Sequence, residues 1–237
     1  MPTTTFNISD NVTLSYNAED SDIGVGLYEI NYHTYVENNP KTAGNIIGLW
    51  KADSNGHILA NATALTIVAV SASNNDGTYG ITIERLSEVN YAFAYIFNTT
   101  LSPTEKGFGS LPVGAVLALP SGLKSLTDPA KLYNFNLSLV LAGGDTQLKY
   151  EGIANTNPSA NKHWIGVWDN DNFDLSKPPV YAAPISGTKP KGITSIDHEV
   201  FHVNQEYTLF YFAGGYNDSD KDESSKDSIA ASVVFSV

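Results

Sequence analysis

The feature that most restricts the fold of this chain is an internal repeat. Segments 39–50 and 157–168 share Asn-Pro, Ile-Gly and a final Trp at a constant offset of 118 residues, and further matches follow in the same order. Several matched positions in one order indicate a duplication, and a unit of this length is a whole domain. The sequence therefore predicts two tandem domains, residues 1–120 and 127–237, joined at a Pro- and Gly-bearing stretch.

Both halves show the alternation of β-strands. Residues 91–95 alternate aromatic and Ala side chains, and every second residue of 135–141 is Phe or Leu. A period of two indicates strands with one buried face. Seven strands are predicted in the second half, at 131–142, 147–153, 163–168, 179–185, 192–197, 207–213 and 229–237. The predicted fold class is all-β, with two tandem β-sandwich domains of Ig-like or jelly-roll type related by internal duplication.

The charge and the residue types present exclude several classes of protein. Thirteen Lys and Arg against 25 Asp and Glu give a net charge of −12, so nucleic acid is an unsuitable partner. The chain has no Cys, which removes disulfides and thiolate metal sites. It lacks both a signal-peptide pattern and an apolar run of the roughly 18 residues that a membrane span needs. We expect a cytoplasmic or non-classically secreted protein that does not insert into membranes.

An acidic loop follows the predicted strand 163–168. Asp169, Asp171 and Asp174, together with Asn170, bring hard oxygen ligands close together in the chain. Calcium takes about six to eight oxygen ligands, and closely spaced Asp and Asn residues supply them. These aspartates are predicted metal ligands. The alternative is a polar hairpin loop built from Asx turns.

A second acidic loop occupies residues 216–227. In an Ig-like sandwich this loop and the first lie at the same end, where their charges repel unless a cation lies between them. We therefore predict that Asp218 and Asp220 join the first loop around Ca²⁺. The alternative is a solvated, charged loop tip.

Aromatic residues next to these loops suggest sugar binding. Trp50, Trp168 and Tyr216 are predicted to stack on the apolar face of a galactose-like ring, and Asp and Asn side chains to bind its hydroxyls. The polar candidates of this kind are Asn170, Asn217, Asp53 and Asn55. The alternative for both tryptophans is an ordinary place in the core. The loop that carries Asp53 is less acidic, so metal is expected mainly in the second half.

One motif resembles a zinc protease site. Residues 198–202 read His-Glu-Val-Phe-His, but zincin chemistry needs both His on one helix face. Pro190 upstream and a strand from about residue 207 leave little room for that helix. Because no other nucleophile or phosphate-binding pattern is present, we predict that the chain is not an enzyme.

The order Asn-Pro, Trp-Ile-Gly-Val-Trp-Asp, Tyr-x-Leu-x-Tyr-Phe and Ala-Ser-Val-Val-Phe in the second half is similar to the Ig-like sandwich of SKICH domains and of domains beside some metallophosphoesterases. That resemblance implies a fold. The tandem, Cys-free form also resembles mushroom tandem-repeat lectins, which implies calcium-assisted galactose binding.

Together these features predict a lectin that binds galactose-type glycans with the help of calcium, through loops at one end of each sandwich. Two sites on one chain would raise the avidity. The alternative is a protein-interaction or cell-adhesion module without a sugar site. Association into a homo-oligomer is left open.

Overall fold

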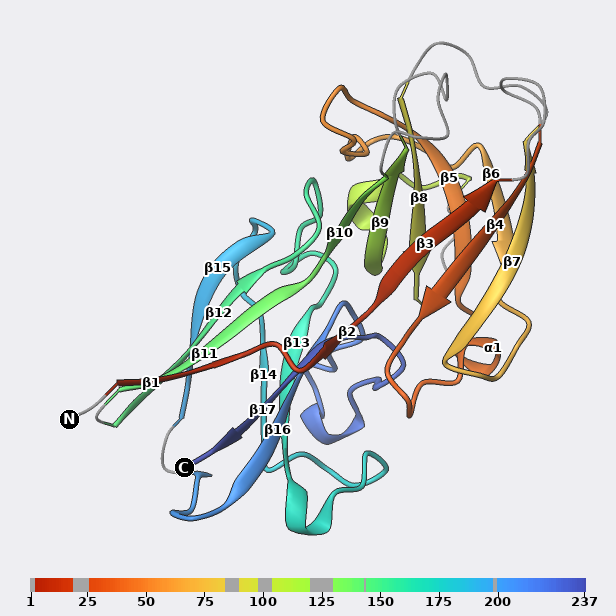
Figure 1. Cartoon of the computed structure of the whole chain (residues 1–237). Helices are drawn as coiled ribbons and strands as arrows, with labels where there is room; N and C mark the ends of the chain where they lie inside the picture. Colours follow the sequence, from red (N-terminus) through yellow and green to blue (C-terminus); the bar gives the residue numbers. More distant parts are fainter. Residues whose placement is uncertain are drawn as a thin grey trace.

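The computed structural model describes residues 3–18, 26–83, 90–97, 104–119, 130–142, 144–197 and 200–237. The protein is all-β, as predicted: strands make up 51% of the described residues and form four antiparallel sheets. Among the described residues the only α-helix is α1 (Pro40–Ala43), which is capped by Asn39 at its N-terminus and by Gly44 at its C-terminus (Figure 1). The predicted domain junction at 120–129 lies outside the described residues.

Two of the sheets consist mainly of strands from the first half of the chain. The three-stranded sheet has the order β3 (Thr13–Ala18), β4 (Gly26–His33), β7 (Asp76–Ile83). The five-stranded sheet has the order β10 (Lys131–Asn134), β9 (Val113–Leu119), β8 (Asn90–Ile96), β5 (Ile46–Ala52), β6 (Thr66–Ala69).

The other two sheets consist mainly of strands from the second half. The four-stranded sheet has the order β1 (Thr3–Asn7), β11 (Asn136–Ala142), β12 (Asp145–Glu151), β15 (Lys191–Ile196). The second five-stranded sheet has the order β14 (Tyr181–Pro184), β13 (Trp164–Asp169), β16 (Glu206–Phe212), β17 (Ile229–Ser236), β2 (Asp10–Asn11).

The two halves exchange edge strands. β2 precedes the first-half strand β3 but pairs with β17, and β10 precedes β11 but pairs with β9. Figure 1 shows both segments running between the two groups of strands. At the crossing, Asn11 Nδ2 donates to Phe135 O and Asn134 Nδ2 donates to Val12 O, both at 3.4 Å. The halves are therefore joined by backbone pairing as well as by the linker.

All seven strands predicted for the second half are present, but one of them is divided. The predicted strand 131–142 becomes β10 and β11, which lie in different sheets and meet at the buried Phe135. A strand that passes from one sheet to another keeps its alternation of side chains, so the sequence pattern does not show the break.

Aromatic side chains from different sheets contact one another. Tyr32 of β4 contacts Tyr95 of β8 with ring centroids 5.7 Å apart, and Tyr150 of β12 contacts Tyr211 of β16 at the same distance. The alternation of residues 91–95 predicts that β8 buries one face, but residues 91–96 are all buried. It is a central strand, and the chain covers both of its faces.

Each half places a polar side chain against one of these tyrosines. Asn45 Nδ2 donates to the Tyr95 hydroxyl at 2.9 Å, and His163 Nδ1 lies 3.0 Å from the Tyr211 hydroxyl. His163 Nε2 is buried and has no hydrogen-bond partner. Because burial disfavours the charged imidazolium, the pKa of His163 falls to about 3.

Candidate functional site

The first acidic loop begins with a short 3-10 helix, η3 (Asn170–Asn172), that is capped by Asp169. Asp169 Oδ1 accepts from the backbone N–H of Asp171 at 2.9 Å and also from the side-chain amide of Gln205. Asp171 Oδ2 accepts from the same amide at 3.3 Å. Asp169 therefore forms an Asx-type turn, and Gln205 ties both carboxylates to the loop before β16.

Asn170 is anchored at both ends of its amide. Its Nδ2 donates to Glu206 Oε1 at 2.8 Å, and its Oδ1 accepts from the Thr208 hydroxyl at 2.7 Å. Both partners belong to β16, which pairs with β13. The loop is thus held against the sheet by side chains of the neighbouring strand.

Asp174 ends the acidic part of this loop. Its Oδ1 accepts from the Ser176 hydroxyl at 2.6 Å and from the Ser176 N–H at 2.9 Å, and its Oδ2 lies 3.8 Å from Lys177 Nζ. The hydrogen bonds from Ser176, followed by the nearby lysine charges, lower the pKa of Asp174. Asp174 is therefore an ionised hydrogen-bond acceptor at neutral pH.

The second acidic loop is organised by its own backbone. Asn217 Oδ1 accepts from the N–H groups of Ser219 and Asp220, at 3.0 and 3.3 Å. Asp220 caps the 3-10 helix η5 (Lys221–Glu223). Asp218 instead forms an ion pair with Lys162, with 3.3 Å between Nζ and Oδ2.

A lysine lies where the two acidic loops approach each other. Lys226 Nζ donates to the carbonyl oxygen of Lys177 at 3.2 Å and lies 5.9 Å from the centre of the Trp168 ring. Burial lowers the pKa of Lys226, although the charges of Asp222 and Asp174 oppose that shift. The ammonium group thus places a positive charge between one aspartate of each loop.

The carboxylates do not form a calcium cage in this arrangement. Among the described residues, no three Asp, Glu or His side chains are grouped so that they could hold a metal. The predicted ligands Asp169, Asp171 and Asp174 are engaged by amide or hydroxyl donors, Asp218 by Lys162 and Asp220 by backbone. Calcium binding stays a prediction.

The two tryptophans predicted to stack on sugar are in the interior. Trp50 is 0% and Trp168 is 3% exposed. Trp50 packs edge-on against Phe108, and Trp168 Nε1 donates to the carbonyl of Lys177 at 3.2 Å. These contacts favour the core alternative, because a sugar ring reaches neither face. Tyr216 is half-buried and contacts Trp164.

The corresponding loop of the first half is a tight turn. Asp53 Oδ1 accepts from the N–H groups of Asn55 and His57, at 2.8 and 2.9 Å. These bonds, with that from His57 the largest cause, lower the pKa of Asp53. The Tyr133 hydroxyl of β10 donates to the backbone carbonyl of Asn55. The turn is thus closed by the strand that crosses from the second half.

A pocket of about 490 Å³ opens beside the first acidic loop. The loop contributes two kinds of lining side chain: the polar Asn170, Asp171, Asp174 and Lys177, and the apolar Phe173 and Leu175. Glu37 of the first half completes the pocket. Glu37 reaches it because Tyr35, two residues earlier, packs on Phe210 of β16 with ring centroids 4.9 Å apart.

Three of these lining residues, Asn170, Asp171 and Asp174, are among the site residues predicted from the sequence, and the other four are not. Phe173 and Lys177 were visible as neighbours of the aspartates in the chain. No sequence signal places Glu37 here, since it lies far away in the other half. The motif at 198–202 is not tested, because His198 and Glu199 lie outside the described residues.

Within the described ranges, no helix has the length and apolar character required to cross a bilayer. A scan against protein-family models gives no match to this chain, and a search of curated proteins gives no significant match either.

Proposed function

We propose that the chain consists of two β-sandwich domains that arose by internal duplication. The sheet orders support this: β3-β4-β7 corresponds to β11-β12-β15, and β10-β9-β8-β5-β6 corresponds to β2-β17-β16-β13-β14. A register irregularity occurs at Tyr95/Ile96 and again at Tyr211/Phe212. The buried Asn45–Tyr95 and His163–Tyr211 pairs recur at the same repeat offsets.

We also propose that the protein binds carbohydrate and does not catalyse a reaction on it. The observation that carries this proposal is the open pocket beside residues 170–177, in which acidic, amide and ammonium groups surround the half-buried Phe173 and Leu175. Sugars present hydroxyls around an apolar ring face. A pocket of this size with a few convergent polar groups is typical of small-ligand sites.

The charge state of the pocket favours binding over proton transfer. The lowered pKa of Asp174 keeps it as an acceptor for ligand hydroxyls and makes it a poor proton donor. Lys177, whose Nζ lies 3.8 Å from Asp174 Oδ2, can donate to a hydroxyl of the same ligand. Galactose-type glycans are the proposed ligands, because a fan of hydroxyls beside one apolar face suits this combination.

A glycan array probed with the full-length protein tests this proposal. We expect a glycan signal, and we expect Asp171→Ala to reduce it about tenfold or more, because a buried ligand hydroxyl would lose its partner. Asp145→Ala, an exposed aspartate on β12, is the matched control and should keep full signal. Melting temperatures of both variants should stay close to that of the parent protein.

Repeating the array with calcium and with a chelator tests the metal separately. A signal that survives the chelator would end the calcium prediction and leave sugar binding intact. A blank array under both conditions would overturn the carbohydrate proposal.

A protein-interaction module is the second candidate, and one surface favours it. β6 is the edge strand of its sheet, and Leu59, Leu65 and Ile67 next to it or on it are 54%, 51% and 41% exposed. Neighbouring exposed apolar side chains often mark contact surfaces. If this surface is the functional one, Ile67→Lys should abolish partner binding, whereas Asp171→Ala should not affect it.

A further inference from the structure

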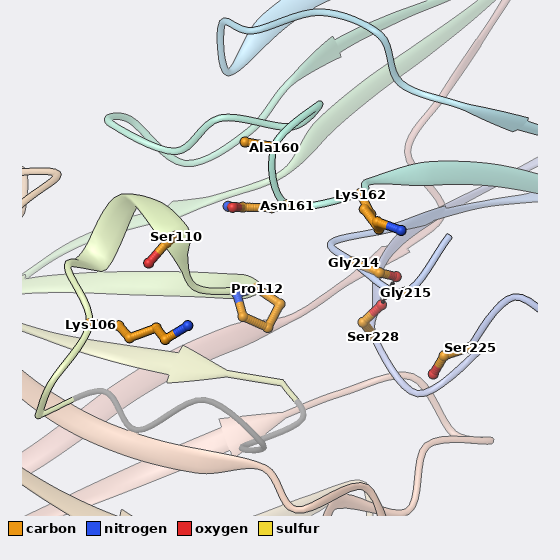
Figure 2. Close-up of a pocket in the computed structure, with 10 residues that line it drawn as sticks. All are labelled: Lys106, Ser110, Pro112, Ala160, Asn161, Lys162, Gly214, Gly215, Ser225 and Ser228. Carbon is orange, nitrogen blue, oxygen red and sulfur yellow. Dashed lines mark hydrogen bonds between the residues drawn. The ribbon is translucent and has the colours of Figure 1, made fainter. Parts of the chain in front are cut away.

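We infer that the cleft between the two halves is a separate ligand site, and that it takes a small hydroxylated molecule carrying an oxyanion group. The cleft has a volume of about 420 Å³. Figure 2 shows that its lining comes from three segments: the one with Lys106, Ser110 and Pro112, the turn at 160–162, and the loop from Gly214 to Ser228. It shares no residue with the pocket beside 170–177.

The charges in this cleft are unusual for the chain. The protein has 25 acidic and 13 basic residues, but the described residues that line the cleft include two lysines and no carboxylate. Lys106 comes from the first half and Lys162 from the second. Positive charge contributed by both halves to one cleft favours an anionic ligand there.

Most of this positive charge is available to a ligand. Lys106 is exposed, and its ammonium makes no ion pair or hydrogen bond with any residue that the structure describes. Lys162 pairs with Asp218 at 3.3 Å, but the two side chains are 58% and 72% exposed. An ion pair as exposed as this contributes little, so a ligand anion can compete for the lysine.

The backbone at Lys162 gives an independent indication. Lys162 has a left-handed conformation, with φ of 55°, whereas the matching position of the first half is Gly44, with φ of 67°. A side chain at such a φ costs energy that glycine avoids. Strained residues of this kind concentrate where a side chain is needed for function. The second half therefore holds a cation in the cleft at a conformational cost.

The rest of the cleft is preorganised and offers acceptors for hydroxyls. Asn161 Nδ2 donates to the carbonyls of Gly109 and Leu111, at 3.1 and 3.2 Å, which ties the two halves together at the cleft wall. Ser110 and Ser225 each donate to a neighbouring oxygen. A hydroxyl that donates still has lone pairs to accept from a ligand. A sugar acid or sugar phosphate has the matching groups.

Calorimetric titration of the full-length protein tests this inference. The probes are glucuronate, glucose 6-phosphate, glucose 6-sulfate and, as the neutral control, glucose. We expect at least one charged probe to bind, with an affinity that weakens as salt increases, and we expect glucose not to bind. The comparison among the three anions identifies carboxylate, phosphate or sulfate as the recognised group.

Lys162→Gly is the decisive variant, since glycine is the residue of the first half at this position. It should weaken anion binding about tenfold or more while leaving the melting temperature unchanged or higher. Asn204→Gly is the matched control: Asn204 also has a positive φ, of 63°, and does not line the cleft. It should relieve strain without changing anion affinity.

Three outcomes would overturn the inference: no binding of any charged probe, binding of glucose as strong as that of the charged probes in the Asp171→Ala variant, or full anion binding by Lys162→Gly. None of them bears on the pocket beside 170–177. Conversely, Asp171→Ala should leave anion binding unchanged, so the two proposals fail separately.

Discussion

Gly166→Ala is expected to destabilise the folded protein by about 2–3 kcal/mol, at the upper end of the usual cost of overpacking a core. A Cβ at Gly166 would lie 2.5 Å from Trp168 Cζ3 and 2.8 Å from Trp164 Cζ3. Neither ring is free to move away. The Trp164 ring stacks on Phe212 with centroids 3.9 Å apart, and the Trp168 indole N–H donates to Lys177 O. Urea denaturation measures the effect.

Gly48 of the first half occupies the position that matches Gly166, so it provides a second test of the overpacking. A Cβ at Gly48 would lie 2.8 Å from two atoms of the Trp50 ring, so Gly48→Ala is expected to behave similarly. In a Trp168→Leu background the smaller side chain relieves the closer of the two clashes, and the cost of Gly166→Ala should shrink. An unfolding free energy for Gly166→Ala within about 0.5 kcal/mol of the parent would contradict this account.

His163→Asn is expected to remove a large part of the loss in unfolding free energy that the parent protein shows at acidic pH. Burial lowers the pKa of His163 to about 3, against 6.5 for the ordinary side chain. Between these values the unfolded chain binds a proton that the folded protein does not. The contribution of the neutral His163 to the free energy of unfolding is therefore fully present above pH 6.5. It falls as the pH drops toward 3, by about 1.4 kcal/mol for each pH unit.

Asparagine is the natural replacement, because Asn45 fills the matching position of the first half and donates to Tyr95. Unfolding free energies of parent and variant should converge, or cross, as the pH falls from 7 to 4. A difference that stays constant over that range would show that His163 is not the titrating group.

His33→Asn is the control with the opposite sign. Burial alone would lower the pKa of His33, but hydrogen bonds and charges from Asp76 and Asp10 outweigh it and raise the pKa. The stability from His33 is therefore present below pH 6.5 and is lost as the pH rises through the folded-state pKa. His33→Asn should therefore keep the fall in unfolding free energy at acidic pH that is attributed to His163.

The candidate site was predictable only in part. The closely spaced Asp and Asn residues after β13 mark a polar loop, and the structure places a pocket beside it. The partners of these side chains could not be read from the chain. Gln205 and Glu206 reach the loop because β16 pairs with β13, and Lys226 approaches Asp174 from a loop about 50 residues further on. Contacts of this kind depend on the strand order, which local composition does not encode.

The place of the tryptophans also could not be predicted from the local sequence. Trp168 stands between a buried strand and an acidic loop, which is compatible with both core and binding surface. Its burial follows from what covers the outer face of the sheet: Phe173 and Tyr35 pack on Phe210, and Lys226 lies over the indole. Tyr35 comes from the other half, so only the folded chain decides the question.

The sequence by itself determined the all-β class, the seven strands of the second half and the recurrence of Ile-Gly before a Trp, because these depend on side-chain alternation and on local close contacts. The tertiary structure alone decided that β2 and β10 exchange sheets, that Lys226 lies between the acidic loops, and that Lys106 and Lys162 face one cleft. The physical reason is that strand pairing brings together residues from distant parts of the chain, and neither their charges nor their spacing along the chain specifies which of them will meet.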